Sequence, residues 1–203
     1  MVFDILYVNG QWITDWPLQH RLDWLANRLK PSPSIQLVSS HEDAEAVYRA
    51  VQGHDMEGIV VKRIDSPYTL AQKSGDWLKI KNYHDLVAVI GGFTLKHGTV
   101  RTLLLGLYDE VRRLHFVGHS GTGKLTDQDW VQLTHLLGHW VTPTCPFRTP
   151  PVGVPGAIWV TPRWTTKIKY MEWHPGKVLR QASIQALVDV APEKCMFSPE
   201  MQR

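Results

Sequence analysis

The chain contains 203 residues with 43% hydrophobic and 20% charged side chains, the composition of an ordinary globular protein of one large or two small domains. Its formal net charge of +3 permits a nucleic-acid partner without requiring one. Cys145 and Cys195 lie far apart, which argues against a metal site and against a disulfide framework. No apolar run has the length of a membrane span and no signal peptide precedes the first segment, so we expect a cytoplasmic chain with no membrane partner.

The first part of the sequence mixes strand and helix patterns. A strand-like run ends in the turn pair Asn9-Gly10, and leucines at helical spacing follow it. Ser39, with Glu42 three residues later, is a candidate capping box for a second helix. The patterns predict strands at residues 2–10, 34–40, 58–63 and 77–95 and helices at residues 15–30 and 41–53.

From Asp85 onward the pattern changes to consecutive short strands with an inserted helix. Several short antiparallel strands with one helix are typical of a small barrel of the OB type. The domain boundary is expected within residues 81–85, which gives domains at residues 1–83 and 84–203. The patterns predict strands at residues 85–95, 101–108, 113–121, 157–162 and 165–173 and a helix at residues 127–140.

A glycine-rich stretch at residues 117–126 partly matches a nucleotide-binding P-loop. Gly118 and Gly123-Lys124 have the spacing of G-x-x-x-x-G-K-[ST], but Leu125 stands where the motif needs a metal-binding hydroxyl. The preceding residues predict two strands of an antiparallel hairpin, whereas a P-loop follows a buried parallel strand. We therefore interpret the stretch as a glycine-rich turn after an antiparallel strand.

The segment from Glu57 to Lys81 carries the pattern with the most chemical content. Glu57 precedes one strand, and Lys79 and Lys81 lie two residues apart on another, so both lysines point to one face. Such a group suits metal-assisted phosphoryl or nucleotidyl transfer, because lysines neutralise charge on an α-phosphate and a carboxylate holds a divalent cation. From periodicity alone, the favoured alternative is the solvated basic face of an edge strand.

Several segments also resemble a known family. Residues 57–62 (EGIVVK) and 77–81 (WLKIK) resemble motifs IV and V of the covalent nucleotidyltransferases, and residues 2–10 resemble motif III of ATP-dependent DNA ligases. The run 57–81 is most similar to the ligase domain of bacterial non-homologous end-joining ligases, and the later segments resemble that family's OB domain. The resemblance implies an α+β fold, with the C-terminal part of an adenylation (nucleotidyltransferase) domain followed by a β-barrel OB-fold domain. It also implies sealing of nicks and breaks in duplex DNA, in repair or recombination, by transfer of AMP from ATP.

The resemblance implies roles for matching residues of the first domain. Phe3 would stack on adenine, and Glu57 would lie near the α-phosphate as a ligand of Mg²⁺ or Mn²⁺. Lys79 and Lys81 would contact the α-phosphate and the charge that develops there. These residues would make up the catalytic and ATP-binding site.

Other basic residues have implied roles in binding nucleotide or DNA. Arg21 would bind the nucleotide or the 5′ phosphate of the nick. Lys62 and Arg63 would face phosphate, Lys62 in the nucleotide site and Arg63 on the DNA backbone. Lys124 would bind the DNA backbone as a point charge. Two further lysines share one strand face, which would meet DNA phosphates or would equally be an ordinary solvated face: Lys167 and Lys169.

The sequence departs from the family pattern in two places. No K-x-D-G, the motif I that carries the lysine nucleophile, occurs among the 203 residues. Residues 188–191 are Val-Asp-Val-Ala, where the family has the R-x-D-K of motif VI. Since motif VI in the family serves chiefly adenylation of the lysine, both departures affect the first step. Glu57, Lys79 and Lys81, which later steps share, remain.

These departures leave three hypotheses open. In the first, the chain is a fragment of a ligase, beginning at motif III, that cannot adenylate itself alone. In the second, an upstream polypeptide supplies motif I and assembles with it. In the third, the chain is a non-catalytic DNA-binding module. The expected partners are nicked duplex DNA, the polypeptide carrying motif I and, by resemblance, a Ku-type end-binding protein.

Overall fold

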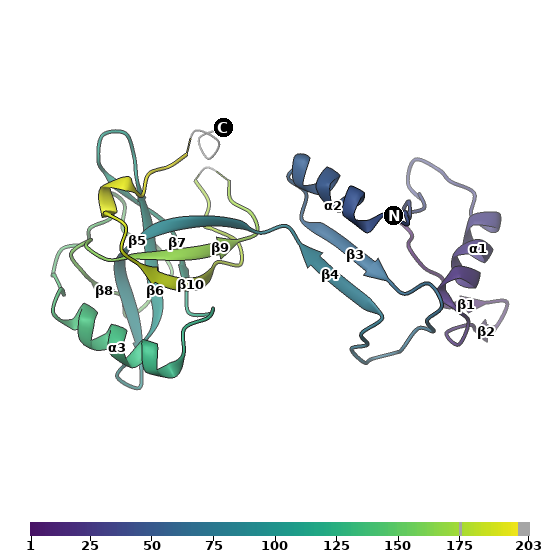
Figure 1. The fold of residues 1–203 in the computed structure, drawn as a ribbon, viewed down its shortest axis with the longest axis horizontal. Helices are drawn as coiled ribbons and strands as arrows, with labels where there is room; N and C mark the ends of the chain where they lie inside the picture. The colour runs from purple at the N-terminus through teal and green to yellow at the C-terminus, as the bar shows by residue number, and fades with distance from the viewer. Residues whose placement is uncertain (175, 199–203) are drawn as a thin grey trace. The chain divides into compact units, whose positions relative to one another are not determined.

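The computed structural model describes residues 1–174 and 176–198. It consists of two compact units, here called the N-terminal unit (residues 1–82) and the C-terminal unit (residues from 83 onward), which are described one at a time (Figure 1). The boundary expected from the sequence lies one residue later, after residue 83. Within the described residues, no helix is both long enough and apolar enough to cross a membrane.

The N-terminal unit is built from short hairpins and helices. Asn9 and Gly10 have φ angles of 48° and 83°, the left-handed conformation that a tight two-residue hairpin turn requires. The second helix packs against the third strand. The elements are β1 (Tyr7–Val8), β2 (Gln11–Trp12), α1 (Leu18–Arg28), α2 (Ala44–Gly53), β3 (Gly58–Lys62) and β4 (Trp77–Lys81).

The strands expected over residues 2–10 and 34–40 are much shorter in the structure. The two segments meet at one parallel bridge, where Val2 N–H donates to the Gln36 carbonyl over 2.7 Å and Val38 N–H donates to the Val2 carbonyl over 2.8 Å. A strand persists only where a neighbour continues the hydrogen-bond ladder. A strand-like sequence is therefore not enough to extend the pairing beyond this bridge.

The N-terminus of α2 also differs from the expectation. Its cap is Asp43, whose carboxylate accepts a hydrogen bond from Ala46 N–H over 2.9 Å. The predicted capping box of Ser39 and Glu42 is therefore wrong. An aspartate immediately before the first helical residue satisfies one of the unpaired N–H groups of the first turn, so the helix begins there.

The hydrophobic core of the N-terminal unit is small. Among the described residues, its buried apolar side chains are Ile13, Leu18, Leu25 and Val51. Several large apolar side chains of this unit are exposed instead, including Trp12 and Leu78 at 65% and 56%.

The C-terminal unit is an antiparallel barrel accompanied by a helix. Its sheet has the strand order β10-β9-β5-β6-β7, and β8 pairs with β5. The order and the helix after the third strand confirm the barrel of the OB type, and with it the predicted α+β fold class. The elements are β5 (His84–Lys96), β6 (Thr99–Tyr108), β7 (Leu114–Ser120), α3 (Asp127–Gly138), β8 (Ile158–Trp159), β9 (Thr165–Tyr170), β10 (Ser183–Val188) and the 3₁₀ helix η1 (Pro192–Lys194).

Backbone contacts between the segment after β7 and β10 join the two ends of this sheet (Figure 1). Lys124 N–H donates to the Ile184 carbonyl and Ile184 N–H donates to the Thr122 carbonyl, each over 2.8 Å. Gly123 and Ile184 form a parallel bridge at the same place. The interior is filled by fully buried side chains from strands and helix, among them Val89, Ile90, Leu103, Leu104, Leu105, Leu133, Leu137, Ile168 and Ile184.

The glycine-rich stretch is part of this closure. Gly123 has a φ of 146°, and a Cβ there would collide with the carbonyl of Ile184, so the loop backbone lies directly against β10. The helix that follows carries Asp127 and Asp129 in its first turn, where they would repel a phosphate. The interpretation as a glycine-rich turn after an antiparallel strand is confirmed, and the P-loop alternative is excluded.

Candidate nucleotide and phosphate site

The hairpin of β3 and β4 brings the predicted lysines onto one face. The strands are antiparallel, with Val60 opposite Lys79 and Gly58 opposite Lys81. Because directly opposite residues of such a pair share a face, the two lysines lie together, as their spacing predicted. Lys79 is exposed and Lys81 is partly buried. We call this surface the lysine face, and its residues are Gly58, Val60, Lys62, Trp77, Lys79 and Lys81.

Gly58 is required by the close approach of the two strands. Its φ is 143°, and a Cβ at this position would collide with the Ile80 carbonyl and would lie 2.8 Å from the Lys81 Cα. Only glycine therefore fits here without moving β4. The glycine sets the register that places Lys79 and Lys81.

Glu57 lies immediately before this glycine, at the Lys81 end of the lysine face. Its carbonyl accepts a hydrogen bond from Asn82 N–H over 2.9 Å, and the Asn82 side-chain amide donates to the Met56 carbonyl over 3.2 Å. Asn82 is buried, so these bonds hold the chain on both sides of the hairpin ends. The Glu57 backbone is thereby fixed next to the strand that carries the lysines.

An aromatic cluster forms the other end of the lysine face. The rings of Phe3 and Trp77 are 6.3 Å apart in an edge-to-face arrangement, and Tyr68 contacts Trp77 with ring centroids 5.5 Å apart. The Lys62 ammonium lies 4.8 Å from the Phe3 ring centroid and 4.0 Å from that of Trp77. Phe3 remains 53% exposed, so part of its ring is open to a ligand.

Lys62 connects the cluster to the strand. Besides its two ring contacts, its ammonium lies 3.4 Å from the Phe3 carbonyl oxygen. Desolvation lowers the pKa of Lys62 below its ordinary value, an effect that Asp4 opposes and Arg21 reinforces. The structure therefore brings Phe3 and Lys62, two of the predicted nucleotide-binding residues, into contact.

Arg21 has a different environment from the other predicted residues. Its side chain is fully buried and forms a two-pronged pair with Asp4, with Nε 2.9 Å from Oδ1 and Nη2 3.1 Å from Oδ2. Its guanidinium also donates to the backbone carbonyls of Trp16 and Ser66. These contacts give Arg21 a structural role in joining α1 to the N-terminal segment. Direct contact of Arg21 with a nucleotide or a 5′ phosphate stays a prediction.

The residues predicted to bind DNA are spread over both units. Arg63 is exposed and lies 3.5 Å from Asp76, and Lys124 is exposed in the glycine-rich turn. Lys167 and Lys169 share the outward face of β9, and the Lys167 ammonium lies 3.4 Å from the Asp85 carboxylate. Their contacts with DNA stay predictions.

Val60 and Trp77 are site residues that the sequence reasoning missed. Val60 is 47% exposed on the lysine face, between the aromatic cluster and the lysines. Trp77 contacts Phe3, Tyr68 and Lys62. The period of two that grouped Lys79 with Lys81 also places Trp77 on the same face. Alternation in β4 could therefore have identified Trp77 as a site residue from the sequence. Finding Val60 required the register between the strands.

Glu57 could bind a divalent cation at a site that is completed by phosphate oxygens of the substrate. Within the described residues, no group of three or more His, Cys, Asp and Glu could hold a metal ion. Mg²⁺ is often bound by one or two carboxylates together with substrate phosphates, without an all-protein cage. Glu57 is exposed and adjoins two lysines that attract phosphate, so a shared site of this kind fits.

Comparison with known proteins identifies both units. Residues 1–81 match the family described as ATP dependent DNA ligase domain, and residues 96–189 match the ATP dependent DNA ligase C terminal region. The multifunctional non-homologous end joining DNA repair protein LigD of Mycobacterium tuberculosis H37Rv is 30% identical over 194 residues, which cover 91% of this chain and 25% of that protein. LigD of Pseudomonas aeruginosa is 29% identical over 204 residues, covering 96% of this chain and 24% of that protein.

A solved structure agrees with these relatives. The ligase domain from M. tuberculosis LigD superimposes with a TM-score of 0.55 at 29% identity, covering 97% of this chain and 65% of that chain. The present chain thus spans about a quarter of the length of the LigD relatives. The resemblance drawn from the sequence motifs, to ligases of the bacterial end-joining type, is confirmed.

Proposed function

Because the chain belongs to the ATP-dependent DNA ligase family, we propose that it takes part in sealing breaks in duplex DNA through transfer of AMP. The observation that carries this proposal is the lysine face. There, an exposed valine and two lysines lie on one hairpin with a carboxylate at its end, and Lys62 of the same hairpin contacts the half-exposed ring of Phe3. This arrangement supports binding of a purine nucleotide by its base and its α-phosphate.

The aromatic end would hold the base and the lysine end the phosphate. Phe3 offers a ring for stacking, and Val60 offers apolar surface on the same hairpin face. Lys79 and Lys81 would neutralise the negative charge that builds up on the phosphate in the transition state. Lys62, in contact with the Phe3 ring, would fix the position of that ring.

In the sealing step, the DNA 3′ hydroxyl oxygen attacks the phosphorus of a 5′ phosphate that carries AMP. A new phosphodiester bond forms, the bond from that phosphorus to the AMP phosphate breaks, and AMP leaves with the electron pair. The hydroxyl proton passes to solvent. Lys79 and Lys81 would stabilise the charge on the leaving AMP, and the C-terminal unit would hold the duplex through Lys124, Lys167 and Lys169.

A divalent cation is the implied cofactor beside ATP. Glu57 would hold Mg²⁺ or Mn²⁺ together with phosphate oxygens, and the ion would supply further positive charge at the reacting phosphate. Phe3, Lys79 and Lys81 would orient the nucleotide through its base and its phosphate, independently of the groups that bind the cation.

A second candidate function is DNA binding without chemistry. It is favoured by the motif VI position, where Val188 and Val190 bring apolar side chains in place of charged ones. K-x-D-G, which precedes motif III in the family, does not occur among the 203 residues, and this does not decide between the two candidate functions. A polypeptide carrying that motif, and a Ku-type end-binding protein, stay predictions about partners, as does a cytoplasmic location.

Sealing of a nicked duplex that already carries 5′ AMP, with Mg²⁺ and without ATP, tests the proposal. This substrate needs no lysine nucleophile, so it depends only on the lysine face, the cation and the grip on DNA. We expect ligated product with the unaltered chain and a loss of about 10²–10³-fold in rate for Lys79→Ala, comparable to removing one group that stabilises transition-state charge. Glu57→Ala should also reduce the rate.

Matched controls are available in the same unit. Lys73→Ala removes an exposed lysine from the loop between β3 and β4, and Glu42→Ala removes an exposed carboxylate before α2, so both should seal at the unaltered rate. If the unaltered chain is folded and binds the nick but gives no product, the second candidate function is correct.

A further inference from the structure

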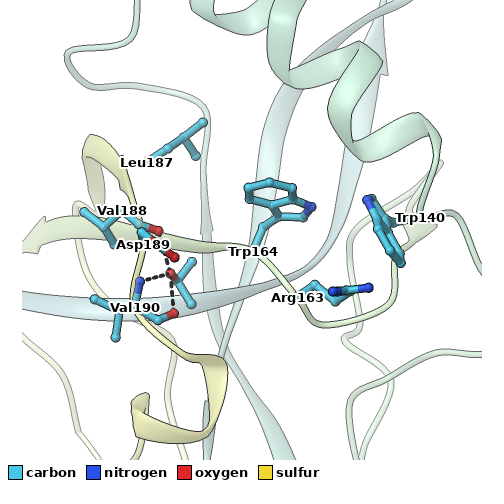
Figure 2. Close-up of a pocket in the computed structure, with 8 residues that line it drawn as sticks. Trp140, Arg163, Trp164, Leu187, Val188, Asp189 and Val190 are labelled. Carbon is cyan, nitrogen blue, oxygen red and sulfur yellow. Dashed lines mark hydrogen bonds between the residues drawn. The ribbon is translucent and has the colours of Figure 1, made fainter.

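A cavity of about 440 Å³ opens on the C-terminal unit, remote in sequence from the lysine face (Figure 2). It lies where the residues before β9 meet the end of β10 and the residue Trp140 after α3. Nothing in the function proposed above uses it. Its walls combine indole rings, aliphatic side chains, a cation and a carboxylate: Trp140, Arg163, Trp164, Val188, Asp189 and Val190.

The aliphatic wall is held in place from within the barrel. The buried hydroxyl of Thr165 lies 2.9 Å from the carbonyl oxygens of both Val188 and Val190. Val190 N–H lies 3.4 Å from the same hydroxyl. These contacts fix the backbone after β10, so Val188 and Val190 present a preformed apolar surface to the cavity.

The opposite wall presents a cation on an aromatic ring. The Arg163 guanidinium carbon lies 4.2 Å from the ring centroid of Trp140, and Figure 2 shows the two side chains together at one end of the cavity. Arg163 is exposed, so its donors remain accessible to an anion. Stacking on the indole restricts the guanidinium to one plane, which lowers the entropic cost of binding a phosphate.

Trp164 adds an unpaired donor to this wall. Its indole Nε1 is buried and has no hydrogen-bond partner within the described residues. The nitrogen edge of its ring lies on the side of Trp140 (Figure 2). An unpaired buried N–H is energetically costly, so a ligand acceptor that reaches this edge would gain the stabilisation that the protein itself does not supply.

We propose that this cavity binds one unpaired nucleotide of a DNA strand that extends beyond the duplex. The base would lie on Trp164 and against the Val188–Val190 wall, and its phosphate would bind Arg163. Stacking on aromatic side chains next to basic groups is how single-stranded nucleic acids are commonly held. The inference rests on the proposed function, since it takes DNA as the partner of the chain.

Asp189 gives the site a preference among bases. Its carboxylate is exposed at the cavity and can only accept hydrogen bonds when ionised. Adenine, cytosine and guanine carry an exocyclic amino group that can donate to it, whereas thymine offers only its ring N3–H. That N–H stands between two carbonyl oxygens, which repel a carboxylate. An unpaired thymine is therefore the poorest ligand of the four.

Fluorescence anisotropy with labelled duplexes tests this proposal on the full chain. The probes are a nicked duplex with blunt ends and duplexes with two-nucleotide overhangs of each base, in both strand polarities. We expect overhangs of adenine, cytosine or guanine to bind more tightly than thymine overhangs and than blunt ends. Arg163→Ala should weaken overhang binding about tenfold, the effect of losing one charge-assisted contact, and leave the nicked blunt duplex unchanged.

Three further variants separate the contacts. Arg148→Ala removes an equal charge from an exposed arginine that does not line the cavity, and it should match the unaltered chain. Trp164→Phe keeps an aromatic ring but removes the N–H, so it should weaken overhang binding less than Arg163→Ala does. Asp189→Asn should reduce the disadvantage of thymine, because an amide can also donate.

The outcomes distinguish this inference from the function on which it rests. Equal binding of overhang and blunt probes, or equal losses for Arg163→Ala and Arg148→Ala, would overturn the nucleotide site while leaving DNA binding intact. Such a result would instead favour an aromatic side chain of a protein partner as the group that occupies the cavity. Absence of binding to every probe would overturn both.

Discussion

Buried leucine, isoleucine and valine side chains fill the barrel of the C-terminal unit, whereas the N-terminal unit has few of them and buries an ion pair. In the barrel, strands close on one another and the helix covers part of the sheet. In the N-terminal unit, Arg21 and Asp4 lie among a handful of apolar residues, and more large apolar side chains are exposed although the unit is shorter. The two units therefore depend on different interactions for their stability.

The difference has a consequence for function. The lysine face lies on a hairpin whose strands pair only with each other among the described residues. Lys167 and Lys169, the β9 lysines proposed to bind DNA, lie on a central part of the barrel sheet, between β5 and β10. Elements with few buried contacts open most easily, so the β3–β4 hairpin, which is proposed to bind the nucleotide, should be the more mobile of the two surfaces. Exposed apolar side chains also suit an interaction surface.

Breaking the buried ion pair should have the largest effect. In Arg21→Met, the Asp4 carboxylate loses its partner while only 4% of its side chain is exposed. We expect the free energy of unfolding of the N-terminal unit to fall by about 3–5 kcal/mol, the cost of leaving a buried charge unpaired. Urea unfolding followed by hydrogen exchange of each unit measures this. The double variant Arg21→Met with Asp4→Leu should regain much of the loss.

The matched change in the barrel is Leu104→Ala, at a fully buried core position. It should cost about 2–5 kcal/mol through the lost apolar contacts and the cavity left behind. If the units are stabilised separately, its effect on exchange should be confined to the C-terminal unit, and that of Arg21→Met to the N-terminal unit. Equal loss of protection in both units for either variant would contradict this division.

A smaller effect is expected for Gly58→Ala on the lysine face. The φ of 143° and the collision of a Cβ with the Ile80 carbonyl force either strain or a shift of β4. Strain of this kind costs about 1–3 kcal/mol. The variant should speed amide exchange in β3 and β4 and reduce sealing of the adenylated nick. Gly53→Ala, at a glycine with open space around it, is the control and should change neither quantity.

The sequence predicted most of the fold because the strand patterns of the barrel are long and regular. Four long strands of the C-terminal unit (β5, β6, β7 and β9) and α3 lie where alternation and helical spacing place them. The fifth, β10, was not predicted. The start of α2 and the segments around Val2 and Leu37 were predicted incorrectly. At α2, two local capping signals competed, and Asp43 caps the helix in place of Ser39. At Val2 and Leu37, the extent of pairing depends on a contact between segments distant in sequence.

For the candidate site too, the sequence predicted local groupings of residues but not the contacts between distant segments. Spacing alone placed Lys79 and Lys81 together, and motif resemblance selected Glu57 and Phe3. The contact of Lys62 with Phe3 joins residues far apart in the chain, so no local pattern could reveal it. The burial of Arg21 likewise depends on Asp4 and on carbonyls from another segment, and an arginine on an amphipathic helix gives no sign of this in the sequence.

The smallest predicted effect concerns a turn of the barrel that, unlike its core, depends on charge. The Asp109 carboxylate, in the β6–β7 connection, accepts hydrogen bonds from Val111 N–H and Arg113 N–H over 3.1 and 2.8 Å. It also lies 2.8 Å from both Arg113 Nε and His115 Nε2. Desolvation raises the pKa of Asp109, but these hydrogen bonds outweigh it and hold the pKa well below the ordinary value.

A carboxyl whose pKa is depressed by folding stabilises the folded state above its unfolded pKa, about 3.9 for aspartate. This stabilisation is lost as the pH falls through the lower pKa of the folded state. Asp109→Asn should therefore lower the urea midpoint of the C-terminal unit at pH 7, and the difference from the unaltered chain should shrink below about pH 4. Glu110→Gln, at the next residue, should show no such dependence. A difference for Asp109→Asn that stays constant down to pH 2 would mean that the turn is held by shape and not by charge.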